Sequence, residues 1–220
     1  MSQTLVDIFN MALGACGSSS TISDASERSR EAAVCRLWYP LVRDNVQTAA
    51  PWPSVKAHQR LARLSASDVP WTDTGAEPGY DFAYSCPSDM LIPYHLDSFQ
   101  RFSYGVFGTT RVLSTSDEGP ILTYNRRSED VAMWDHPLII STVYTLATHI
   151  ARQVTGRSTT IGENKQLATE IVQDMRMSVA NAQDERFETL PDHLVARGYA
   201  NPTPSRYYYP MQSLNFGAAT

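Results

Sequence analysis

Cysteine is scarce in this 220-residue chain. Its three cysteines, Cys16, Cys35 and Cys86, lie far apart, and no two of them form a CxxC pair. An odd number of widely spaced thiols argues against a disulfide framework and against a zinc site. We therefore expect each cysteine to be a small buried apolar residue.

Long apolar runs and an excess of cations are also missing. No apolar run reaches about 18 residues, so no membrane span is expected. The first twenty residues lack a basic stretch and include Asp7, which is not typical of a signal peptide. The net charge is −5, whereas a tight grip on DNA needs clustered cations that face phosphates. The charge argues against a protein that grips DNA, but not against one that DNA passes.

The sequence contains no recognisable catalytic motif. The stretch ALGACGSSS is not a phosphate-binding loop, and HExxH and GxSxG motifs are absent. Neighbouring carboxylates, as in SDEG and DER, do not predict the separated pair of a glycosidase. We expect no enzymatic activity, no cofactor and no metal site. The histidines are scattered: His58, His95, His136, His149 and His193.

Two helices are predicted before residue 51. The first is QTLVDIFNMALGAC, with apolar residues at helical spacing. A second run opens at SDASERSREAA, where Asp24 is a good N-cap and Glu27 completes a capping box. Pro40 predicts a bend near Tyr39, and the run stops before AAPWP. The predicted buried residues are Leu5, Ile8, Phe9, Ala12 and Leu13 in the first helix, and Val34, Leu37, Trp38, Leu41, Val42 and Val46 in the second.

Two further helices are predicted in the second half. One begins after Asp135, which can cap it, with Pro137 in its first turn, and it ends at Gly156. The other runs from about Glu163 to Phe187. The predicted buried residues are Ile139, Ile140, Val143, Leu146, Ala147, Ile150 and Val154 in the third helix, and Leu167, Ala168, Ile171, Val172, Met175, Val179 and Ala182 in the fourth.

Residues 55–132 have a different character. YDFAYSCP, SFQRF and RVLST have the composition of strands. RVLSTSDEGPILTYN predicts a hairpin in which Gly119 adopts a positive φ. Prolines confine the strands to short, edge-like pieces: Pro70, Pro78, Pro87, Pro93 and Pro120.

These patterns predict a mainly α protein with a β insertion (α+β). Residues 1–54 and 133–190 are expected to form a four-helix bundle. Residues 55–132 are expected to be a small β-rich insertion, and residues 191–220 an extended C-terminal arm.

The C-terminal stretch GYANPTPSRYYYPMQSLNFGAAT shows neither helical nor strand periodicity. Disordered tails are usually poor in aromatic residues, yet this one includes Tyr199, Tyr207, Tyr208, Tyr209 and Phe216. Exposed aromatic side chains usually belong to interfaces. We therefore expect the tail to dock on a partner; the alternative is that it folds back over its own bundle.

Four stretches follow one another in a characteristic order: NMALGACG with TISDASERSREAA, then LWYPLVRDNVQTAAPWPSVKA, YDFAYSCPSDMLIPY, and ILTYNRRSEDVAMWDHPLIISTVYTLATHIARQVTG. Their order and spacing, over residues 3–188, resemble the head-to-tail adaptors of double-stranded DNA phages. The likeness is to tail tubular protein A and related adaptors of short-tailed phages.

The resemblance implies a structural virion protein of the neck, assembled in the host cytoplasm. Twelve copies would form a ring below the portal protein, extend the DNA channel and join the portal to the tail tube or nozzle protein. Double-stranded DNA would pass through the lumen without specific binding. Pro51 and Trp52 would form a structural corner, with Trp52 in the core. The portal-docking arm would include Arg206, Tyr207, Tyr208, Tyr209, Met211, Leu214 and Phe216.

Two physical arguments agree with such a ring. A mildly acidic protein can present carboxylates to a lumen, so that DNA phosphates are repelled. A ring also needs heterologous contacts, in which one face of a subunit meets a different face of the next. Small residues such as Ala147 and Ala151 would permit close approach. Two alternatives remain open: a virion-associated peptidoglycan hydrolase, and a helical interaction module of a host cell.

Overall fold

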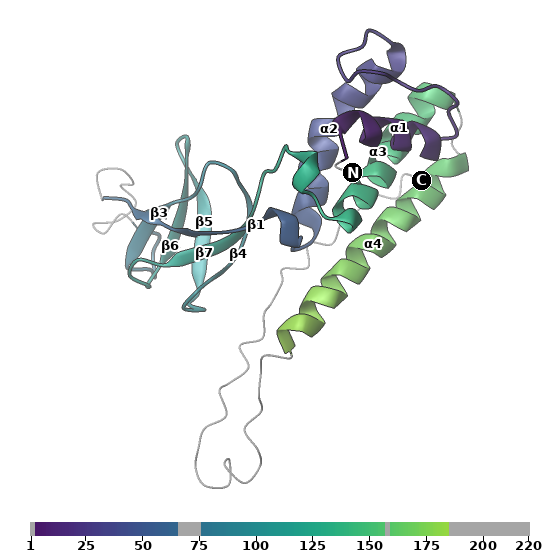
Figure 1. Cartoon of the computed structure of the whole chain (residues 1–220). Helices are drawn as coiled ribbons and strands as arrows, with labels where there is room; N and C mark the ends of the chain where they lie inside the picture. Colours follow the sequence, from purple (N-terminus) through teal and green to yellow (C-terminus); the bar gives the residue numbers. More distant parts are fainter. Residues whose placement is uncertain (1–2, 66–75, 157–158, 185–220) are drawn as a thin grey trace, which may run out of the picture. The chain divides into compact units, whose positions relative to one another are not determined.

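The computed structural model describes residues 3–65, 76–156 and 159–184 (Figure 1). Four α-helices in this part of the chain are α1 (Leu5–Ala15), α2 (Arg30–Ala49), α3 (His136–Thr155) and α4 (Thr159–Asp184). Between α2 and α3 the described residues form seven strands: β1 (Lys56–Arg60), β2 (Ala62–Arg63), β3 (Phe82–Ser85), β4 (Met90–Leu96), β5 (Phe102–Phe107), β6 (Thr110–Thr115) and β7 (Ile121–Arg126). Two 3-10 turns, Pro53–Val55 and Val131–Met133, flank the strands.

The fold class predicted from the sequence is wrong. The strands form two antiparallel sheets, ordered β1-β7-β4 and β2-β3-β6-β5, so the molecule is an α+β mixture and not a helix bundle with a small insertion. The sheets bury apolar side chains of their own, which a small insertion would not do. One such cluster is Leu61, Tyr84, Cys86, Met90, Leu96, Leu113, Leu122 and Tyr124.

Helix α1 agrees with its prediction. The Thr4 side chain accepts a hydrogen bond from the Asp7 amide, and Asp7 reaches back to the Thr4 amide, which completes a capping box. The predicted face is buried at Ile8, Phe9, Ala12 and Leu13.

Helix α2 begins later than predicted. Ser29 is its N-cap and accepts a hydrogen bond from the Ala32 amide at 3.3 Å. Asp24 instead binds the amide and hydroxyl of Ser26, two residues on, because short acidic side chains also stabilise turns. Pro40 lies inside α2, which continues to Ala49, so the proline does not end the helix.

Helix α3 has the predicted ends. Asp135 accepts from the Leu138 amide at 3.1 Å, Pro137 lies in the first turn, and Gly156 adopts the left-handed conformation with φ of 69°. Its buried side chains, which include Leu146 and Ile150, pack against those of α1 and α2 in the main core.

Helix α4 explains why the predicted bundle fails. It starts at Thr159, four residues before the predicted Glu163. Among its described side chains only Asn164 and Ala168 are buried. Ile161, Ile171, Val172 and Met175 are half-buried against the main core. The helix therefore lies along three packed helices and does not complete a fourth side of the core.

The predicted hairpin at residues 111–125 does not form. Strand β6 pairs with β3 and β5, whereas β7 pairs with β1 and β4. The segment between β6 and β7 therefore carries the chain from one sheet to the other. Gly119 does have the predicted positive φ, 72°. Pro93 lies on β4, an edge strand, as expected for a residue without an N–H.

The Tyr84 side chain binds the segment that connects β6 to β7. Its hydroxyl donates to the Asp117 carbonyl at 2.8 Å and accepts from the Gly119 amide at 2.9 Å. We expect Tyr84→Phe to lower the free energy of unfolding by about 1–2 kcal/mol, because two partly buried hydrogen bonds are lost without a large cavity. Urea titration measures this change. Tyr104→Phe on exposed β5 is the matched control, and an equal loss in both variants would contradict the role of Tyr84.

Candidate interaction surfaces

The outward face of α2 is apolar. Leu37 is 70% exposed and Leu41 is 62% exposed. Ala33 and Pro40 are also exposed, and half-buried Val34 and Trp38 border them. These positions share one side of the helix at the spacing of i, i+4 and i+7. We call the exposed residues Ala33, Leu37, Pro40 and Leu41 the α2 strip.

The opposite side of α2 is also apolar, because Cys35, Tyr39, Val42 and Val46 are buried in the main core. A surface helix usually has an apolar stripe on one side and polar residues on the other, whereas a helix that is apolar all round is buried. The predicted stripe combined these two sides, which is why Leu37 and Leu41 were expected in the core. Their exposure corrects that prediction.

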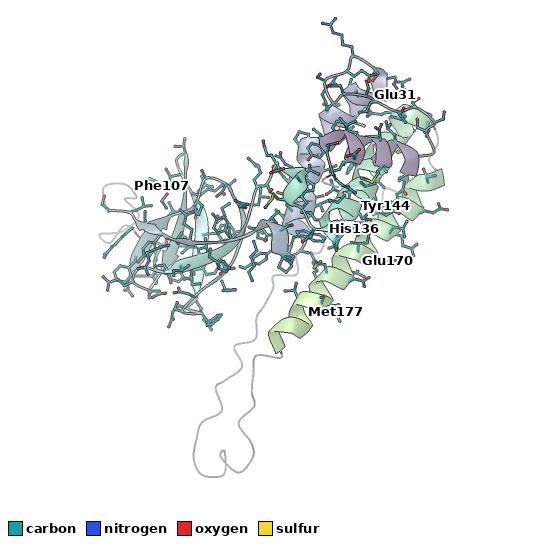
Figure 2. All side chains as sticks on the ribbon, in the orientation of Figure 1. Glu31, Phe107, His136, Tyr144, Glu170 and Met177 are labelled. Atoms are coloured by element: carbon teal, nitrogen blue, oxygen red, sulfur yellow. The ribbon has the colours of Figure 1, made fainter. Side chains whose placement is uncertain are left out.

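A second unusual surface lies on α4. Its outward residues Glu163, Leu167, Glu170, Asp174 and Met177 follow the spacing i, i+4, i+7, i+11 and i+14 of one helix side. We call these five residues the α4 line. Leu167 is 40% exposed and Met177 is 64% exposed. Figure 2 shows Glu170 and Met177 on this helix.

Charges on α4 are segregated. The three acids of the α4 line lie together, whereas helical geometry puts Lys165 and Arg176 on another side. The Arg176 side chain donates to the Ala49 carbonyl at the end of α2, at 2.6 Å. The Asn164 side chain donates to the Ala15 carbonyl at the end of α1, at 3.1 Å. These bonds fix the helix so that the α4 line faces outward.

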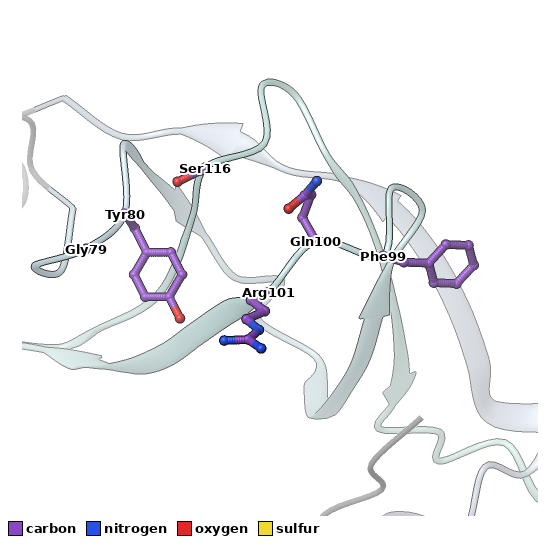
Figure 3. A pocket seen from close by; sticks show the side chains of 6 residues that line it. All are labelled: Gly79, Tyr80, Phe99, Gln100, Arg101 and Ser116. Carbon is purple, nitrogen blue, oxygen red and sulfur yellow. The ribbon is translucent and has the colours of Figure 1, made fainter. Parts of the chain in front are cut away.

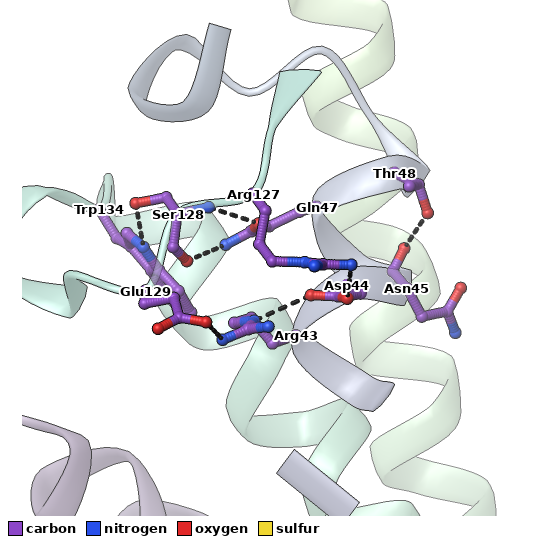
Figure 4. Close-up of polar contacts among 9 residues, drawn as sticks. All are labelled: Arg43, Asp44, Asn45, Gln47, Thr48, Arg127, Ser128, Glu129 and Trp134. Atoms are coloured by element: carbon purple, nitrogen blue, oxygen red, sulfur yellow. Dashed lines mark hydrogen bonds and ion pairs between the residues drawn. The ribbon is translucent and has the colours of Figure 1, made fainter. Parts of the chain in front are cut away.

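A polar cluster joins α2 to the segment after β7 (Figure 4). Gln47, which is fully buried, donates to the Ser128 carbonyl at 2.8 Å and accepts from the Ser128 amide at 3.1 Å. The Asn125 side chain on β7 donates to the carbonyls of Gln47 at 2.6 Å and Ala50 at 2.8 Å. Trp134 donates from its indole to the Ser128 hydroxyl at 3.2 Å. We call this set the clasp.

Ion pairs extend the clasp. Arg43 contacts Asp44 and Glu129, each at 2.9 Å, and Arg127 contacts Asp44 at 2.8 Å. Burial alone would lower the pKa of Arg43, but the hydrogen bonds to Asp44 and Glu129 outweigh it and the pKa is raised. The Arg43 guanidinium thus stays charged and is paired with two carboxylates. Sequence reasoning missed the clasp, because Gln47 and Asn125 are 78 residues apart and no local pattern connects them.

One open hollow lies beside the four-stranded sheet (Figure 3). Its volume is about 470 Å³, and its lining is Gly79, Tyr80, Phe99, Gln100, Arg101 and Ser116. The lining contains one cation and no carboxylate, so it lacks the acid and base pair that hydrolysis of a glycosidic bond requires.

His58 on β1 and His95 on β4 both lie opposite Thr123 of β7, but no group of three possible metal ligands occurs in the described part of the chain. The ring of His149 stacks on that of Trp38, with 4.9 Å between centroids. His58 and Thr123 lie within hydrogen-bond distance, at 2.9 Å. His193 is outside the described residues.

The three cysteines are buried and free of disulfides, as predicted. The Cys16 thiol donates to the Ala147 carbonyl at 3.2 Å. Burial raises the pKa of Cys16 to about 11, that of Cys35 to about 12 and that of Cys86 to about 11. These groups are therefore protonated and unreactive at neutral pH.

Of the site residues expected from the sequence, Pro51 and Trp52 lie between α2 and the 3-10 turn, and both are buried. The Trp52 indole donates to the Val46 carbonyl at 2.7 Å. Ala147 and Ala151 are fully buried in the subunit's own core, so they cannot provide the close approach between subunits expected of them. The predicted portal-docking arm, Arg206–Phe216, lies outside the described residues.

No described helix is long and apolar enough to cross a bilayer. Comparison of the sequence with known proteins gave no matching family model, and no curated protein matched it at a significant level.

Proposed function

We propose that the chain is a structural assembly protein, the head-to-tail adaptor of a double-stranded DNA phage. Copies of it would form a ring, twelve in the resembled family, below the portal protein. The ring would extend the DNA channel and join the portal to the tail tube or nozzle protein.

The α2 strip is the observation that carries this proposal. Two leucines that are more than half exposed on one helix side cost solubility unless another surface covers them. A subunit whose final state is an assembly has such a surface. The α2 strip alone does not identify the assembly. The choice of a phage adaptor ring rests on the four sequence stretches described above, whose order resembles that family.

The clasp supports the same role. A connector transmits load between neighbouring proteins, so its helices and sheets must hold a fixed relation to each other. Gln47 and Asn125 make four buried hydrogen bonds between α2 and the β7 region. Buried hydrogen bonds between packed elements favour one arrangement of those elements, although the Asn125 Oδ1 atom itself has no hydrogen-bond partner among the described residues.

The experiment uses rings of the portal protein encoded in the same genome as the chain. The full-length chain is mixed with the rings, and the complexes are purified by sedimentation and imaged by electron microscopy. We expect an added ring on one end of the portal, with an axial opening. Portal rings that remain bare at a several-fold excess of the chain contradict the proposal.

The same preparation separates the alternatives. A peptidoglycan hydrolase would release soluble fragments from purified cell walls and would leave portal rings bare. A host interaction module would do neither. Bovine serum albumin at equal concentration is the control for non-specific attachment to the portal.

A further inference from the structure

We infer that the α2 strip of one copy is covered by the α4 line of a second copy of this chain. The inference rests on the proposed function, since it names the surfaces by which one subunit meets the next. It concerns the contact between copies only, and not the attachment to the portal.

The first support is apolar complementarity. The α2 strip offers Leu37 and Leu41 one turn apart, and the α4 line offers Leu167 and Met177. Packing of one helix on another seats side chains of this size in the grooves of the partner. Methionine adapts to an irregular apolar surface better than other residues do, which suits Met177 to the surface around exposed Pro40.

The second support is charge. The α4 line carries three carboxylates: Glu163, Glu170 and Asp174. Arg30 and Arg36 lie on or beside the α2 strip at its N-terminal end. Both guanidinium groups are held there by backbone carbonyls, Arg30 by Gln153 at 2.7 Å and Arg36 by Ala25 at 2.6 Å and Glu27 at 2.8 Å. Cations on one helix and acids on the other favour this pairing.

Asp24 and Glu27 stay charged beside the strip and offset part of the Arg36 field, so Arg30 supplies most of the attraction. Asp24 accepts hydrogen bonds from the amide and hydroxyl of Ser26, and Glu27 accepts from Ser23. Asp44, at the other end of the strip, pairs with both Arg43 and Arg127. Parallel pairing of two α2 strips would bring Arg30 and Arg36 towards like charges, which is unfavourable.

The geometry of the contact agrees with a ring. The two surfaces are different and lie on different helices, α2 and α4. A contact between unlike faces is heterologous, so each copy keeps one free surface of each kind. Such contacts continue from copy to copy and give a ring when the rotation between copies closes, whereas a contact between like faces stops at a dimer.

Disulfide trapping between separate single-cysteine variants tests the pairing. Leu37→Cys and Leu41→Cys are each mixed with Leu167→Cys and Met177→Cys in the full chain, without portal, at the highest soluble concentration, under mild oxidation. We expect a heterodimer on a non-reducing gel for at least one α2–α4 mixture. The native cysteines are buried and do not compete.

The matched control is Thr169→Cys, which is exposed on another side of α4 and should form at least tenfold less heterodimer. Leu37→Cys alone should form little homodimer. The double variant Leu37→Ser/Leu41→Ser should reduce sedimentation-detected self-association at least tenfold. Neutralising the acids in Glu170→Gln/Asp174→Asn should weaken self-association about two- to fivefold.

Three outcomes overturn the inference: no α2–α4 heterodimer, a homodimer of Leu37→Cys that exceeds it, or a Thr169→Cys product of equal yield. Failure of the proposed function is a separate result. Portal rings that stay bare while the heterodimer forms reject the adaptor role and leave the contact between copies intact. An added ring on the portal that shows no α2–α4 cross-link rejects this contact between copies and leaves the adaptor role intact.

Discussion

Trp52→Ala should lower the free energy of unfolding by about 3–5 kcal/mol. Trp52 is fully buried in the main core, directly after α2 and before the first sheet. Its removal leaves a large cavity where the chain turns from helix to strand, and the Val46 carbonyl loses the indole donor that lies 2.7 Å away. Urea titration followed by circular dichroism measures the loss.

Trp52→Phe separates the two contributions. Phenylalanine keeps most of the apolar volume but cannot donate to the Val46 carbonyl, so the expected loss is about 1–2 kcal/mol. If Trp52→Ala costs less than about 1 kcal/mol, the placement of this side chain in the core is wrong.

Gln47→Ala should be the next most damaging change, with a loss of about 2–4 kcal/mol. The Gln47 side chain makes two hydrogen bonds, one to the amide and one to the carbonyl of Ser128. Ser128 is itself buried, so both backbone groups would be left without a partner in a low-dielectric region. The same urea titration reports the effect.

Asn45→Ala is the matched control for the clasp. Asn45 lies two residues away on the exposed side of α2, and its replacement should change stability by less than about 0.5 kcal/mol. Similar losses in the two variants would show that the damage comes from shortening a side chain on α2 and not from opening the clasp.

Local sequence signals predicted α1 and the ends of α3 well. The capping residues Thr4 and Asp135 and the stop at Gly156 act through neighbours three or four residues away, and this is the range in which spacing is informative. The burial of Ile8 and Leu146 followed from the same periodicity. Such patterns could place α1 and α3, because each has one clearly apolar side.

Long-range pairing could not be predicted in the same way. Strands β6 and β7 are adjacent in sequence and have a turn between them, but they join different sheets. The segment between the two strands is bound by the Tyr84 hydroxyl, 33 residues from Asp117 and 35 from Gly119. No local pattern reveals such a partner, so the size of the β region was underestimated.

The α2 strip shows a further limit of periodicity. Helix α2 carries apolar residues on two opposite sides, and the sequence alone does not say which side faces the subunit's own core. The sequence predicts Leu37 and Leu41 in one buried stripe with Val42 and Val46. In the structure Val42 and Val46 are buried, whereas Leu37 and Leu41 are exposed. These exposed leucines are the surface that we propose another copy covers.

The most direct test of the account measures how accessible position 37 is before and after assembly. Leu37→Cys is labelled with a maleimide in the free chain and in the ring formed on portal, and the labelling rates are compared by mass spectrometry. We expect rapid labelling of the free chain and at least tenfold slower labelling in the ring, because the neighbouring α4 covers the site. Equal rates in the two states would show that the α2 strip stays open, and the account of this chain as a ring subunit held together through α2 would be wrong.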